Sequence, residues 1–189
     1  MKLLKILAVP FALAACSTSP QAYKSESPKM DFITYFSGTT HGYGAIYSRT
    51  GKVTDRFHVT MQGTPGTNSQ GQRTLNLAED FTYTSGKTQK RAWFVTEPAK
   101  GQLTATAPDV PGGAVGEQSG NAVNFNYRLT IERDNGKSIT LGSDDWMWML
   151  PDNIVMNRNY LSKFGINVAE LVITFTKQPP LSPTLNTKH

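Results

Sequence analysis

Residues 122–141 read AVNFNYRLTIERDNGKSITL, and this stretch decides the fold. From Val123 to Ile131, apolar and polar side chains alternate one by one, which is typical of a strand with one buried face. Residues 134–136 supply a three-residue hairpin loop that ends in glycine, the residue best suited to left-handed backbone. With this loop, Ile131 faces Ile139 across an antiparallel pair. The stretch therefore predicts a β-hairpin with one apolar face.

The same turn occurs twice more, as RTGK at 49–52 and TSGK at 84–87. Other breaks rich in Gly, Pro and Asn divide the chain into about ten short strands, with only brief helical turns expected near 31–36 and 162–164. Sequential hairpins favour neighbouring strands over Greek-key crossings. We predict an all-β, antiparallel, up-and-down β-barrel of about 8 to 10 strands. A transmembrane barrel, with its apolar face outward, is the alternative that alternation leaves open.

The N-terminus carries a second clear pattern. Lys2 and Lys5 precede a short apolar run, and the run ends in Leu-Ala-Ala before Cys16. An apolar run of about ten residues is too short to span a bilayer and is typical of a signal peptide. The sequence around Cys16 resembles the lipobox of bacterial lipoproteins. The resemblance implies that residues 1–15 are cleaved and that Cys16 becomes a lipidated N-terminus, with acyl chains holding the protein on a membrane.

The remaining chain divides into three parts. Residues 16–30 are expected to form the lipidated N-terminus and a flexible tether, residues 31–177 the barrel domain, and residues 178–189 a loose tail. Cys16 is the only cysteine, which excludes an internal disulfide. Ser17 follows it, and in Gram-negative lipoproteins of this kind this indicates the periplasmic face of the outer membrane. We expect that location if the host is Gram-negative.

Composition excludes several classes of partner. Loss of residues 1–15 removes two lysines and lowers the formal charge from +5 to +3. Because no cluster of Lys or Arg is present, we expect no nucleic-acid partner. His41, His58 and His189 lie beside no second predicted ligand, so we expect no metal and no cofactor. The chain also lacks a Gly-x-Ser-x-Gly motif, which argues against a serine hydrolase. We expect a monomer or a weakly associating protein.

Glu79 is a charged residue in the phase of an apolar face. It alternates in step with Leu77 and Phe81. The hairpin loop at 84–86 then sets Arg91 directly opposite Glu79. Since buried charges must balance in sign to remain charged, this hairpin predicts an interior ion pair.

Two further charges follow the same logic. Asp145 shares the phase of Met147, although a bulge just before it would turn Asp144 inward instead. Arg158 shares the phase of Met156. The predicted inward polar cluster consists of Glu79, Arg91, Asp145 and Arg158.

Aromatic and methionine side chains provide an apolar wall. The loop at 49–51 puts Tyr43 and Tyr47 on the side of Phe57. The predicted apolar lumen consists of Tyr43, Tyr47, Phe57, Phe125, Met147 and Met149. Arginine binds carboxylate or phosphate through two parallel hydrogen bonds, so the two arginines could hold such a head group while the wall takes an apolar tail.

Several short motifs also carry a resemblance. They are Phe36-Ser37-Gly38, Glu79-Asp80-Phe81 with Gly86 and Arg91-Ala92-Trp93, Asp145-Trp146-Met147, Asn157-Arg158 and Lys163-Phe164-Gly165. Together they are similar to a family of bacterial lipoproteins catalogued as a domain of unknown function, over residues 28–177. The resemblance implies a lipocalin-like barrel. It brings no established activity and no catalytic residue.

Three functions are compatible with these patterns. The leading hypothesis is non-enzymatic binding of a lipid or another amphipathic small molecule in the barrel lumen. The second is an envelope interaction protein with a filled barrel, and the third is an enzyme that acts on an apolar substrate through Glu79 or Asp145. A lumen of about 300 Å³ or more would favour the carrier, whereas side chains that meet across the axis would favour the filled barrel.

Overall fold

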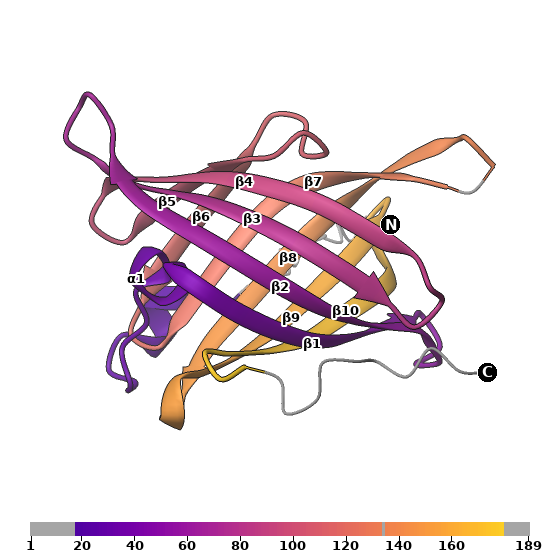
Figure 1. Cartoon of the computed structure of the whole chain (residues 1–189), viewed down its shortest axis with the longest axis horizontal. Helices are drawn as coiled ribbons and strands as arrows, with labels where there is room; N and C mark the ends of the chain where they lie inside the picture. The colour runs from indigo at the N-terminus through magenta and orange to yellow at the C-terminus, as the bar shows by residue number, and fades with distance from the viewer. Residues whose placement is uncertain (1–17, 134, 180–189) are drawn as a thin grey trace, which may run out of the picture.

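The chain forms a closed ten-stranded barrel (Figure 1). The computed structural model describes residues 18–133 and 135–179, so the predicted signal peptide, Cys16, His189 and the end of the C-terminal tail lie outside the described residues. The strands are β1 (Gly38–Ser48), β2 (Val53–Thr67), β3 (Arg73–Tyr83), β4 (Thr88–Ala99), β5 (Gln102–Thr106), β6 (Ala114–Ser119), β7 (Ala122–Glu132), β8 (Ser138–Leu150), β9 (Ile154–Lys163) and β10 (Ile166–Thr176). Three short helical segments accompany them: η1 (Pro20–Tyr23), α1 (Phe32–Phe36) and η2 (Pro151–Asn153).

Every strand pairs antiparallel with its neighbour in the chain, and β1 pairs with β10 to close the wall. This confirms the prediction of an all-β, up-and-down barrel. The turn glycines Gly51, Gly86 and Gly136 all have left-handed backbone, with φ of 81°, 86° and 73°. Ile131 pairs with Ile139, as the predicted hairpin requires.

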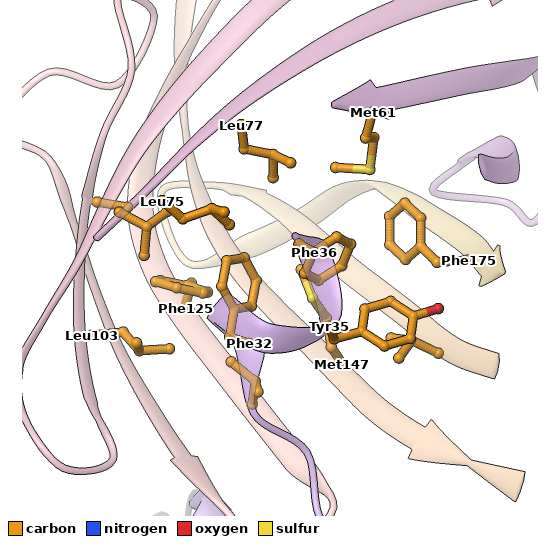
Figure 2. Packing of buried hydrophobic residues seen from close by; sticks show 14 of the residues in the cluster. Phe32, Tyr35, Phe36, Met61, Leu75, Leu77, Leu103, Phe125, Met147 and Phe175 are labelled. Atoms are coloured by element: carbon orange, nitrogen blue, oxygen red, sulfur yellow. The ribbon is translucent and has the colours of Figure 1, made fainter. Parts of the chain in front are cut away.

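The apolar face of the alternating strands points into the barrel (Figure 2). Leu75 and Leu77 are 0% and 2% exposed, and Val123 is fully buried. This orientation is opposite to the outward apolar face of a transmembrane barrel. No helix within residues 18–133 and 135–179 is long and apolar enough to cross a membrane.

The short helix α1 plugs one end of the barrel. Phe32 and Phe36 insert among the interior side chains, and the Phe36 ring meets Phe175 edge to face at 5.3 Å between centroids (Figure 2). The backbone of α1 approaches β2 so closely that a Cβ on Gly63 would lie 1.9 Å from the Phe36 carbonyl oxygen. Only glycine fits at that position, so β2 is shaped to receive the helix.

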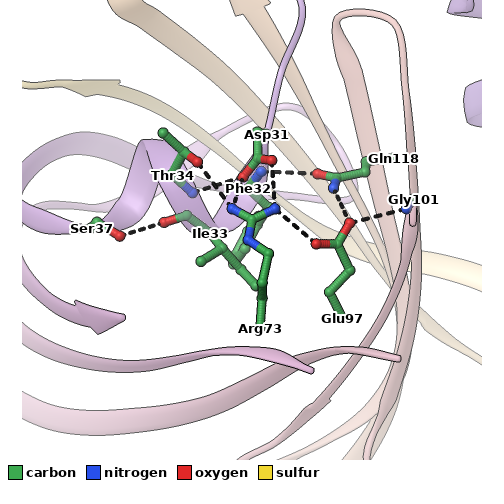
Figure 3. A network of polar contacts seen from close by, with 9 residues as sticks. All are labelled: Asp31, Phe32, Ile33, Thr34, Ser37, Arg73, Glu97, Gly101 and Gln118. Carbon is green, nitrogen blue, oxygen red and sulfur yellow. Dashed lines mark hydrogen bonds and ion pairs between the residues drawn. The ribbon is translucent and has the colours of Figure 1, made fainter. Parts of the chain in front are cut away.

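Arg73 clamps α1 to the rim (Figure 3). Its two terminal nitrogens donate to the two carboxylate oxygens of Asp31 at 2.8 Å each, and one also donates to Glu97 at 2.8 Å. Asp31 caps the helix as well, because its carboxylate accepts from the Thr34 backbone N–H at 2.8 Å. These hydrogen bonds, those from Arg73 foremost, lower the pKa of Asp31 to about 2. The clamp therefore stays ionised across the physiological range.

Of the predicted flexible tether of residues 16–30, the structure describes residues 18–30, and these pack against the barrel. Pro20 is buried, and Tyr23 packs edge to face against Trp146 and Trp148 at 6.0 and 6.3 Å. The two tryptophans stack on each other on the outer wall, while Met147 between them points inward. Tyr23 covers this aromatic surface on the outside of the barrel, and the contact holds the N-terminal segment in place.

Replacement of Arg73 by Ala should loosen α1 without unfolding the barrel. The substitution removes a forked ion pair and a helix-anchoring contact, with a loss on the order of 1 kcal/mol in the free energy of unfolding. Hydrogen exchange of the amides of residues 32–37 should accelerate more than that of the strands.

Lys90→Ala is the matched control, because Lys90 pairs with Asp80 on the exposed surface, with side chains 88% and 62% accessible. It should leave exchange in α1 unchanged. Equal exchange rates in Arg73→Ala and the unmodified protein would contradict the clamp.

Candidate functional site

The barrel interior contains a cavity of about 100 Å³. Phe36 and Met61 belong to its largely apolar wall. Its polar lining side chains are Glu79, Arg91, Tyr127, Asp145, Asn157 and Asn159. The volume is smaller than the roughly 300 Å³ expected of a lipid carrier. The cavity therefore fits a small molecule or the end of a single chain, and it excludes a bulky lipid.

Glu79 and Arg91 face each other across β3 and β4, as predicted. Glu79 Oε2 lies 3.9 Å from Arg91 Nη1, which is too far for a hydrogen bond. Arg91 Nε instead donates to Oδ1 of Asp109 in the β5–β6 loop at 3.1 Å, with Oδ2 at 2.9 Å, and the guanidinium lies 4.3 Å above the Trp93 ring. The arginine is thus held mainly by the loop and the indole.

Two polar atoms of this pair are left without partners. Glu79 Oε2 and Arg91 Nη2 are buried and make no hydrogen bond within the described part of the chain. Buried polar atoms are nearly always paired, because desolvation without compensation is costly. Both residues line the cavity, so its wall includes one side chain with an unmet acceptor and one with an unmet donor.

Burial raises the pKa of Glu79 to about 7, against the opposing effect of Arg91. Asp145 and Asp109 add to the rise through like-charge repulsion. Glu79 is consequently close to half protonated at neutral pH.

Asp145 is also buried, but its hydrogen bonds are satisfied. Asn157 donates its side-chain amide to one carboxylate oxygen, and the Tyr127 hydroxyl donates to the other at 3.0 Å. Asn159 donates to the Tyr127 hydroxyl oxygen at 3.0 Å and accepts from Ser143 at 2.8 Å. Burial raises the pKa of Asp145 to about 6, while the hydrogen bonds from Asn157 and Tyr127 oppose the rise. Asp145 thus belongs to a closed network that fixes three strands.

The structure resolves which of the paired aspartates faces inward. Asp145 lines the cavity, whereas Asp144 accepts a hydrogen bond from Asn124 at 2.7 Å on the outer side of the wall. No bulge intervenes between β7 and β8 here, since Phe125 pairs with Asp145 and Asn126 with Asp144 in continuous register.

Arg158 lies on the outer wall, so its predicted place in the inward cluster is wrong. Its side chain is 48% exposed, pairs with Glu170 and covers the Tyr160 ring. After the turn η2, Val155 of β9 pairs with Met149 of β8. This register brings Asn157 rather than Arg158 to the interior face of β9. Because the outer face of β9 also carries apolar residues, the alternation in its sequence indicated the wrong face as the interior one.

Tyr43 and Tyr47 are also misplaced by the prediction. A β-bulge shifts the β1–β2 register between positions 46 and 47, so Tyr43 pairs with His58 and Phe57 pairs with Gly44. Tyr43 is 40% exposed and packs on the His58 ring outside the barrel. Alternation along β1 places Tyr47 on the same outer face. The bulge adds one residue to β2, so the interior and outer faces of β1 are exchanged relative to the prediction.

The other predicted lumen residues lie inside the barrel. Phe125 and Met147 line the cavity, whereas Phe57 and Met149 are buried in the core but do not reach it. The predicted site list omitted four residues that line the cavity, Trp93, Tyr127, Asn157 and Asn159, and also Asp109, which pairs with Arg91. Hairpin register contains the signal for Trp93 and Tyr127, but no periodicity could place Asp109, which lies in a loop.

The outer wall carries two stacked histidines. The rings of His41 and His58 lie 5.6 Å apart with an interplanar angle of 12°. Burial lowers the pKa of His58, and the neighbouring His41 lowers it further. Across residues 18–133 and 135–179, no group of three or more His, Cys, Asp or Glu side chains is placed to hold a metal ion.

Residues 10–177 match the model of a family described as "Protein of unknown function (DUF3833)". The chain belongs to this family. Among solved structures, the DUF3833 chain is similar to an S-type phycobiliprotein lyase from Guillardia theta, with a TM-score of 0.56 and 9% identity over 79% of this chain and 92% of that one. At this identity the likeness shows the fold alone, a lipocalin-like barrel. A comparison with curated proteins finds no match.

The buried carboxyl of Glu79 should make the stability of the barrel depend on pH. The folded protein keeps this proton up to a pKa of about 7, whereas the unfolded chain releases it near 4.5. The free energy of unfolding therefore falls as the pH rises through this window. Glu79→Gln lacks this contribution and should gain stability relative to the unmodified protein between pH 5 and pH 8, by on the order of 3 kcal/mol at most. Denaturant unfolding at both pH values measures the change.

Asp80→Asn serves as the control, because Asp80 is the adjacent exposed acid on the same strand. Its stability difference from the unmodified protein should not change in this manner. A Glu79→Gln variant whose relative stability is the same at both pH values would show that Glu79 ionises normally in the folded state.

Proposed function

We propose that this protein binds a small amphipathic molecule in its barrel lumen, without catalysis, while a lipid on Cys16 holds it on the periplasmic face of an outer membrane. The observation that carries the binding proposal is the unpartnered pair of polar atoms on the wall of an apolar cavity. Its location and anchor rest on the sequence alone.

The barrel leaves a space unfilled beside a buried pair of charged residues. Well-packed apolar residues in place of a buried ion pair are often neutral or stabilising. Here the chain instead keeps Glu79 and Arg91 beside an unfilled space, with Glu79 Oε2 and Arg91 Nη2 unsatisfied. A bound molecule with a polar end at these atoms and an apolar end against Phe36 and Met61 would satisfy both parts of the wall.

The small cavity keeps a second function in consideration. The α1 plug fills one end of the barrel, and the lumen of about 100 Å³ is close to that of a filled barrel. A filled barrel with a functional outer surface would serve as an envelope interaction protein. The stacked histidines and the exposed Tyr43 on the outer wall provide features that such a partner could recognise.

Filling the cavity should abolish small-molecule binding. Ala105 lines the cavity, and Ala105→Leu adds three carbon atoms to that wall. We expect six-carbon amphiphiles to shift the Trp93 indole signal in NMR spectra of the unmodified protein, and to shift it at least tenfold less in the variant at equal concentration. Thr104→Leu, at the exposed neighbouring position, should leave binding intact.

Absence of any shift across 1-hexanol, hexanamide, hexylamine and hexanoate would overturn the binding proposal and favour the filled barrel. A shift that persists unchanged in a folded Ala105→Leu variant would place the binding site elsewhere.

The anchor is tested at Cys16. The described chain begins at Thr18, which lies with Tyr23, Trp146, Trp148 and Tyr160 around a shallow pocket on the outer wall. Cys16→Ser should release the protein from membranes into the soluble periplasmic fraction. Membrane retention of that variant, or an unacylated Cys16 in the mass spectrum of the exported protein, would contradict lipidation.

A further inference from the structure

The charges inside the barrel are not those of an anion site. With Arg158 outside, Arg91 is the single cationic side chain that lines the cavity within the described residues. Glu79 and Asp145 line the same cavity, and Asp109 of the β5–β6 loop pairs with Arg91 without lining the cavity itself. Acidic groups therefore outnumber the basic one.

Arg91 is already compensated. Its Nε bonds to Asp109, its plane covers Trp93, and Glu79 lies beyond hydrogen-bond distance at 3.9 Å. An anionic head group at Arg91 would gain one hydrogen bond from Nη2. It would also lie against the Glu79 carboxylate, and like charges in a low-dielectric site repel strongly.

A cationic head group is disfavoured for the same kind of reason, with the charges exchanged. An ammonium group would donate to Glu79 Oε2 but can accept nothing, so Arg91 Nη2 would remain buried and unpaired. The ammonium would also meet the positive guanidinium at close range. Each charged head group thus satisfies one atom of the pair and repels the other residue.

A neutral group with both functions satisfies both atoms. A hydroxyl donates one hydrogen and accepts through its lone pairs, and a primary amide does the same with two atoms. Such a group placed beside the pair donates to Glu79 Oε2 and accepts from Arg91 Nη2 without adding charge. Its apolar portion extends toward Phe36 and Met61.

Building on the proposed function, we infer that the lumen selects a short amphiphile with a neutral hydroxyl or amide head group and discriminates against carboxylate, phosphate and amine head groups. This reverses the expectation that two inward arginines would hold an acidic head. The experiment compares 1-hexanol, hexanamide, hexanoate, hexylamine and hexane at pH 8, where Glu79 is largely ionised. Dissociation constants come from the Trp93 indole shift.

We expect 1-hexanol and hexanamide to bind at least tenfold more tightly than hexanoate, hexylamine or hexane. Hexanoate or hexylamine binding as tightly as 1-hexanol would overturn the selectivity and leave the proposed function standing. Hexane binding as tightly would show that the polar pair plays no part. If none of the five binds, the proposed function itself fails.

A variant separates the charge effect from the shape of the site. Glu79→Gln keeps an acceptor at this position and removes its charge, so hexanoate should bind at least threefold more tightly relative to 1-hexanol. Arg158→Met, which removes an arginine from the outer wall, is the control and should leave this ratio unchanged. An unchanged ratio in a folded Glu79→Gln variant would contradict exclusion by the Glu79 charge.

Discussion

The pairing of β1 with β10 is the constraint on which the structure depends. It closes a wall in which every strand has two neighbours, so no sheet edge is left exposed. Closure gives every second residue an interior position, and the space inside must then be filled by side chains. Aromatic residues of α1 fill one end. What they leave is a small chamber whose walls are set by the alternation of the strands.

Polar residues within this chamber have two different roles. Asp145 is held by Asn157 and Tyr127, so its oxygens are satisfied and its network ties β7, β8 and β9 together. Glu79 and Arg91 face each other at a separation that leaves both incompletely bonded. The first arrangement stabilises the wall. The second keeps hydrogen-bonding capacity available to a guest, which is why we place the functional site there.

Local turn chemistry made much of this fold predictable. A glycine at the end of each three-residue loop fixed the register of its hairpin, and that register correctly placed Glu79 opposite Arg91. The loop alone predicted the wrong register where a β-bulge interrupts the hairpin. The bulge in the first hairpin turned Tyr43 outward, and neither flanking sequence carries a signal strong enough to announce it.

Hydrophobic periodicity failed in β9 for a different reason. Its interior face carries Asn157 and Asn159, whose amides bond inside the barrel, while its outer face carries apolar Met156. The pattern therefore pointed Arg158 inward. Asp109 and the packed N-terminal segment depend on contacts between residues far apart in the chain, which no local pattern encodes.

The most direct test of a ligand-holding lumen is native mass spectrometry of the protein extracted gently from its own membrane. We expect a small noncovalent ligand that is lost on denaturation and is missing from the Ala105→Leu variant, with any covalent lipid common to both. The mass of the protein without ligand in both proteins, or a ligand equally abundant in the Ala105→Leu variant, would contradict a ligand-holding lumen.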